Sequence, residues 1–150
     1  GSERMYTFSL QKVLDYRKKQ EELAQQRLAG VLLEREHARQ VVEQVQDALF
    51  RCQEEYTGLQ TPELDLPQLL MASELAGVLT DRLRHSRQEL KEKEACLRQE
   101  QRRTEKAMRD RKILDKLREK AERQYLQEEE RKEQQLMDEL ARTVFLRTHS

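Results

Sequence analysis

The stretch that decides the fold is residues 24–56, AQQRLAGVLLEREHARQVVEQVQDALFRCQEEY. Its apolar residues recur alternately four and three positions apart, which averages about 3.5 residues, the period that keeps one stripe of a helix against a partner helix. Together with two leucines further upstream, the stripe consists of Leu10, Leu14, Ala24, Leu28, Val31, Ala38, Val42, Val45, Leu49, Cys52 and Tyr56. We call this stripe the seam, and it predicts a coiled-coil strand interrupted by Arg17, Glu21 and Arg35.

The composition favours the same class of fold. Charged residues make up 39% of the chain and aromatic residues 5%, so large apolar side chains are too few for a broad globular core. Disorder and a globular helical bundle are the alternatives, but disordered polar tracts have no reason to keep a heptad register. We expect one coiled-coil domain over residues 5–150, a tag or disordered start at residues 1–4, and no membrane span.

Breakers divide the chain into two helices. Gly58, Pro62 and Pro67 place a breaker at about 58–66, between a helix over about 8–57 and a longer one over about 67–147. Because a short link makes neighbouring helices antiparallel, the predicted fold is all-α, an elongated antiparallel two-helix coiled-coil hairpin with a longer C-terminal helix.

Local signals suggest how these helices begin. Thr7 or Ser9 is expected to cap the first helix, and Asp65 the second, with Gln68 at the third helical position. Gly77 is expected either to kink the second helix or to end a short first piece of it.

Two alignments of the hairpin match apolar residues with apolar residues. With a tight turn, Val42 meets Leu83, and the C-terminal turns, with Leu136, Leu140 and Val144, have no helix beside them. With level chain ends, Val45 meets Met108 instead, and residues 58–93 protrude. We favour the tight turn, since connections between packed helices are usually short.

The sequence offers no motif for catalysis, cofactors or metals. Cys52 and Cys96 are isolated, the histidines are scattered, and no phosphate-binding loop or zinc motif occurs. Residues 58–81 carry four acidic and no basic residues, whereas residues 82–125 carry 16 basic and 9 acidic ones. A basic helix can bind nucleic acid, but the interspersed carboxylates and the lack of aromatic residues favour a solvated face.

Two segments resemble a known family. Residues 8–17, FSLQKVLDYR, resemble the opening of the flagellar export protein FliJ, and residues 111–120, RKILDKLREK, resemble its C-terminal signature, which residues 133–140, EQQLMDEL, extend. The resemblance implies a non-enzymatic stalk and chaperone component of the bacterial flagellar type III export apparatus. It implies binding at the centre of the hexameric export ATPase, to the export-gate membrane protein FlhA and to export chaperones, in the cytoplasm at the inner membrane.

The resemblance also suggests which residues meet partners. The expected contact surface is the segment from Arg111 to Leu140, most of it without a neighbouring helix and with Arg111 and Lys112 off the seam. A second contact is expected from Phe8 to Arg17. The candidate partner-binding residues are Phe8, Leu10, Leu14, Arg17, Arg111, Lys112, Leu114, Leu117, Lys120, Tyr125, Asp138 and Glu139.

Other functions remain open. The closest is the equivalent stalk of a virulence type III injectisome, and the next is a coiled-coil spacer that dimerises. A single proline-containing break favours an intramolecular hairpin, and hence a monomer, over a parallel dimer. A nucleic-acid-binding protein is the third alternative, and its binding would weaken steeply with salt.

Overall fold

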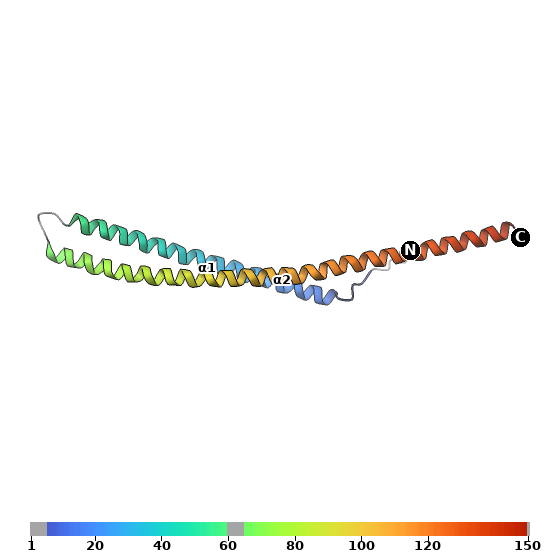
Figure 1. Ribbon diagram of the computed structural model, residues 1–150, viewed down its shortest axis with the longest axis horizontal. Coiled ribbons are helices and arrows are strands. Elements are labelled where there is room, and N and C mark those ends of the chain that lie inside the picture. The colour runs from blue at the N-terminus through green and yellow to red at the C-terminus, as the bar shows by residue number, and fades with distance from the viewer. Residues whose placement is uncertain (1–5, 60–64, 150) are drawn as a thin grey trace. The chain divides into compact units, whose positions relative to one another are not determined.

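The computed structural model describes residues 6–59 and 65–149, and these form two helices, α1 (Gln11–Gly58) and α2 (Leu66–Thr148) (Figure 1). No strand occurs in these ranges, so the predicted all-α hairpin with a longer second helix is confirmed. Neither helix contains a segment that is long and apolar enough to cross a membrane, as far as the described residues go. The expected tag at residues 1–4 and the turn residue Pro62 lie outside those residues.

The start of α2 follows the predicted signal, and the start of α1 does not. The backbone N–H of Gln68 donates to the Asp65 carboxylate at 3.4 Å, which satisfies one of the unpaired donors in the first turn. α1 instead begins after a tight backbone turn, in which the Gln11 N–H donates to the Phe8 carbonyl oxygen at 3.0 Å. Within the described residues, neither Thr7 nor Ser9 supplies the expected side-chain cap, so this prediction was wrong.

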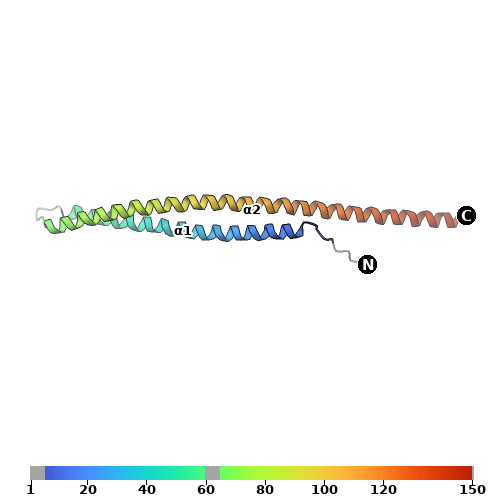
Figure 2. The ribbon, with the colours of Figure 1, turned by 90° about the horizontal axis from the view of Figure 1, so that it is seen from below.

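Within residues 23–105, α1 and α2 lie side by side and run in opposite directions (Figures 1 and 2). Val42, Val45 and Leu83 form the buried core of this contact, and Val41, Leu49 and Leu90 pack against it. Val42 and Leu83 are the pair expected from the tight-turn alignment.

Polar contacts across the same section fix the direction of pairing. The Cys52 thiol donates to the Ala72 carbonyl oxygen at 3.4 Å, the Lys93 ammonium lies 3.0 Å from the Glu34 carboxylate, and the Thr104 hydroxyl donates to the Ala24 carbonyl oxygen at 3.4 Å. As the residue number falls along α1 it rises along α2, which confirms an antiparallel hairpin in the tight-turn alignment.

This alignment also separates the two cysteines, both of which are free thiols. Because Cys52 lies beside Ala72, about 24 residues of α2, roughly 36 Å, separate it from Cys96. A disulfide requires α-carbons within about 7 Å, so the geometry excludes an intramolecular bond.

Gly77 does not interrupt the second helix. α2 is continuous from Leu66 to Thr148, so the expectation that Gly77 ends a short first piece was wrong. Open space surrounds the position that a Cβ would occupy at Gly77, so no close approach of another segment requires glycine there. A single glycine costs a helix only about 1 kcal/mol relative to alanine, which a long helix tolerates.

A second section of the hairpin joins the start of α1 with the later part of α2, residues 6–22 with residues 106–149. Leu14 is completely buried here, and Phe8 is 7% exposed. The rings of Tyr6 and Tyr125 lie with their centroids 5.2 Å apart. The charged residues of this section form the first of the candidate surfaces described below.

Candidate partner-binding surfaces

A cluster of three charged residues includes an ion pair between the two helices in the section of residues 6–22 and 106–149. Arg111 binds the Glu21 carboxylate through two nitrogens, with Nε at 2.6 Å from Oε2 and Nη2 at 3.2 Å from Oε1, and its Nη1 lies 2.7 Å from Asp115. One turn away, Arg17 reaches Asp110 at 3.4 Å. We call Glu21, Arg111 and Asp115 the ionic cluster. Paired hydrogen bonds between a guanidinium and a carboxylate are both stronger and more directional than single ones.

The ionic cluster is partly shielded from water. The side chains of Glu21, Arg111 and Asp115 are 12%, 24% and 31% exposed. The hydrogen bond from Arg111 is the main reason that the pKa of Glu21 lies below its ordinary value, against the opposing effect of burial. The same bond, with that to Asp115, raises the pKa of Arg111. Both partners therefore stay charged at neutral pH.

This geometry corrects the expectation for Arg111. We expected its side chain to lie off the seam and to be available to a partner, but it is engaged with α1 through Glu21. The polar interruptions Arg17 and Glu21 are thus not defects of the seam, because each has an oppositely charged residue on α2. Whether Arg111 also touches a partner stays a prediction.

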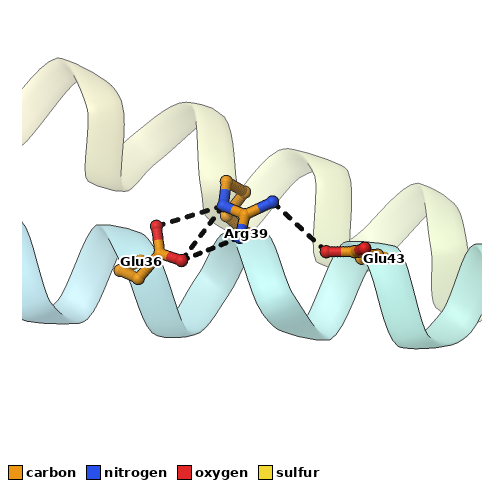
Figure 3. Close-up of polar contacts among 3 residues, drawn as sticks. All are labelled: Glu36, Arg39 and Glu43. Carbon is orange, nitrogen blue, oxygen red and sulfur yellow. Dashed lines mark hydrogen bonds and ion pairs between the residues drawn. The ribbon is translucent and has the colours of Figure 1, made fainter.

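A second charged cluster has the same chemistry and a different placement. Arg39 binds Glu36 with two nitrogens, at 2.8 Å and 3.0 Å, and binds Glu43 at 3.2 Å, all within α1 (Figure 3). These three side chains are about half exposed to solvent. Such pairs, three and four residues apart on one helix, stabilise that helix locally and carry no information about its partner helix.

Most of the predicted contact residues in the N-terminal segment take part in the hairpin itself. Phe8 and Leu14 are buried, and Arg17 is paired with Asp110. Leu10 is 41% exposed and is the apolar residue of this candidate set that faces solvent here. The sequence alone could not distinguish the buried and paired residues from the exposed one, because all of them belong to one segment that resembles the family.

Apart from Arg111, the predicted C-terminal contact residues fall into two groups. Leu114 and Tyr125 are half-buried, and Tyr125 lies against Tyr6. The remaining candidates are exposed to solvent, and they are Lys112, Leu117, Lys120, Asp138 and Glu139.

The last part of α2 has no covering helix. From residue 130 to residue 149 every residue is exposed, and we call residues 130–148 the α2 overhang. Its apolar side chains are between 55% and 61% exposed, and they are Leu136, Met137, Leu140, Val144, Phe145 and Leu146. Leu136, Leu140 and Val144 are therefore exposed, as the tight-turn alignment predicts. Phe145 and Leu146 were missed by the heptad analysis because they lie off its stripe, although three consecutive apolar residues near a polar helix end are a readable signal.

No group of three metal-ligating side chains occurs among the residues that the structure describes. A buried polar side chain of α2 is incompletely paired: Glu100 is 7% exposed, with one carboxylate oxygen 2.9 Å from Arg103 and the other without a partner in the described chain. The carboxylate of Glu100 thus lowers stability locally, since a buried oxygen without a hydrogen bond is costly.

These features define the class of the protein, a two-helix coiled-coil hairpin with an uncovered helix end. Comparison with known families gives a match to the family described as flagellar FliJ protein, over residues 6–150. The chain belongs to this family, and the resemblance seen in its two terminal segments is confirmed. No curated protein and no solved structure matched the chain. Membership makes it a component of the flagellar type III protein export apparatus.

Proposed function

We propose that the chain is a non-enzymatic stalk of the export apparatus that binds the centre of the hexameric export ATPase and stimulates it. It works in the cytoplasm as a monomer, at the inner face of the membrane, where it also meets the export-gate protein FlhA and the export chaperones. Family membership supports the setting, and the α2 overhang supports the mode of binding.

The observation that carries this proposal is the apolar surface of the α2 overhang. Six large apolar side chains in a helix of 19 residues without a neighbour are more than a solvated helix needs. Leu136, Leu140 and Val144 follow one another at intervals of four residues and therefore lie on one face. A helix that presents such a face is a common element of recognition by a grooved partner.

Electrostatic attraction comes from lysines that the hairpin leaves in solvent. Lys112 and Lys120 are exposed, whereas Arg111 is committed to Glu21. An acidic surface on the ATPase would therefore attract the two lysines first, and such contacts act mainly on the rate of association. Leu117, which is 43% exposed, would add contact area between them.

The experiment compares exposed apolar side chains in two parts of the chain. Leu140→Gln with Val144→Gln should weaken binding to the purified export ATPase by about tenfold or more and abolish stimulation. Leu33→Gln is the matched control, because Leu33 is 75% exposed but lies where α1 is paired with α2. It should leave both measurements unchanged, and circular dichroism should be the same for all three proteins.

One result would remove the proposal. If the double variant bound and stimulated the ATPase like the wild type and restored motility to a strain lacking the protein, the α2 overhang would not be the contact surface. A spacer that acts only through the hairpin would then be the better description.

A further inference from the structure

An apolar groove lies between the end of α1 and the start of α2. Its volume is about 600 Å³, and it is lined by four apolar residues, Leu59, Met71, Ala72 and Leu75, and by Glu55 and Gln68. Met71 is 70% exposed and Leu75 is 50% exposed, so the hairpin leaves at least half of each residue uncovered. The groove is remote in sequence from the α2 overhang and takes no part in the function proposed above.

The apolar face continues beyond the groove along α2. Met71, Leu75 and Val78 are spaced by four and three residues, which places them on one face of the helix. Val78 is 59% exposed. A face of this spacing beside a groove matches a docked helix, whose anchors recur with the same spacing. Met71 adds adaptability, because its unbranched thioether side chain fits partners of different shapes.

The stretch of sequence that contains the groove residues carries charge of one sign. Residues 52–81 contain six acidic residues and neither lysine nor arginine. Glu55 and Glu74 are exposed, and neither forms an ion pair with another residue in the described ranges. The nearest basic residues along the chain are Arg51 and Arg82, and the Arg51 guanidinium donates to the Asp47 carbonyl oxygen of its own helix.

From the apolar groove and its acidic border, we propose that the groove binds an amphipathic helix of a partner protein that carries lysine and arginine beside its apolar face. The apolar side chains of that helix lie against Met71 and Leu75, and its cations meet Glu55 and Glu74. Two other occupants fit less well. A second copy docked groove to groove would bring like charges together, and an anionic membrane surface would be repelled by the same carboxylates.

Two synthetic peptides test this assignment on the full-length protein by fluorescence anisotropy. Both have about 18 residues, or five helical turns, and the same leucine spacing, but one carries Lys and Arg and the other Glu at the remaining positions. The basic peptide should bind the wild type at least about tenfold more tightly than the acidic one, and added salt should reduce this difference.

Variants then locate the binding. Met71→Gln with Leu75→Gln should weaken the basic peptide about tenfold, and Glu55→Lys with Glu74→Lys should reverse the preference toward the acidic peptide. All four side chains are exposed or border the groove, so the fold should persist. Leu140→Gln with Val144→Gln is the control for nonspecific binding to the α2 overhang and should change neither affinity.

The outcomes are decisive in each direction. Equal binding of both peptides, or binding that the Met71 and Leu75 changes leave intact, would overturn the proposal. A dimer in sedimentation that the same changes dissociate would assign the groove to a second copy instead. Because no ATPase is present, these results are independent of the stalk function, and the groove variants should still stimulate the ATPase normally.

Discussion

Two sections of the hairpin join the same pair of helices by different means. Around Val42, Val45 and Leu83 the two helices are in contact through apolar side chains. At the ionic cluster, an ion pair joins Glu21 of α1 to Arg111 of α2, and Asp115 of α2 also binds Arg111. Apolar contacts are strong but poorly directional, because almost any apolar side chain can replace another across the seam. The ions are more selective: in the alignment with level chain ends Arg111 would face Val42, and its charge would be buried without a partner. From this comparison we expect the apolar section to contribute more to stability and the ionic cluster more to the register.

The largest effect is expected from a substitution that disrupts the apolar section. Val42→Asp places a charge in the buried core, where Val42 is 8% exposed, and should reduce the free energy of unfolding by about 3–5 kcal/mol. Leu33→Asp is the matched control on the solvent face of the same helix and should cost less than about 1 kcal/mol. Urea denaturation measures both, and equal midpoints would contradict the seam assignment.

A smaller effect is expected from the ionic cluster. Arg111→Ala removes the partner of Glu21 and Asp115 and should reduce the free energy of unfolding by about 1–2 kcal/mol, because partial exposure weakens each charged hydrogen bond. It should also loosen the register. Hydrogen exchange should therefore speed up around residues 14–21 more than around residues 38–45. Uniform acceleration in both regions would mean that the cluster does not define a separate section.

The pH dependence sharpens the same comparison. The pKa of Glu21 lies below its ordinary value of 4.5, so the bond to Arg111 stabilises the fold fully above about pH 4.5, and this stability is lost as the pH falls through the lowered pKa. Glu21→Gln should accordingly lower the melting temperature at pH 7, and the difference from wild type should shrink as the pH is lowered from 4.5 to 3. A difference that stayed constant over this range would show that the carboxylate charge contributes nothing.

The smallest effect is expected from the solvent-exposed cluster on α1. Arg39→Gln removes the contacts with Glu36 and Glu43 (Figure 3), yet it should leave the urea midpoint unchanged within error. Gln is also a good helix former, so helix propensity is nearly conserved. A loss as large as that of Arg111→Ala would mean that pairs within one helix matter as much as pairs between helices.

Much of the fold could be read from the sequence, because heptads and breakers are local signals. The alternation through Val42 and Val45 identified the seam, and Asp65 identified a helix start. The position of Arg111 could not be read in this way. An ion pair between helices depends on the register to within a residue, and apolar matching left two registers open. The charged interruptions Arg17 and Glu21 could have identified the register, because only the tight-turn alignment places them beside Asp110 and Arg111.

The candidate surfaces were predicted less well than the fold. Leu136, Leu140 and Val144 were identified because they repeat with helical spacing, and they are exposed. Phe8 and Leu14 have the same apolar character but are buried against other residues of the hairpin. Sequence alone does not distinguish an apolar residue that packs inside the hairpin from one that awaits a partner, because both obey the same periodicity.

The continuity of α2 has a consequence for how the uncovered end holds its shape. Starting a helix in water is unfavourable by a factor of about 1,000, or roughly 4 kcal/mol, whereas extending an existing helix is nearly neutral. Since α2 runs without a break from Leu66 to Thr148, the hairpin acts as the nucleus for the α2 overhang, and bonds such as Arg131–Glu128 and Gln134–Asp138 then maintain it. As a free peptide, the same residues would have to nucleate a helix on their own and would be largely unfolded. Such a peptide would have to fold on binding a partner, whereas the α2 overhang is already helical.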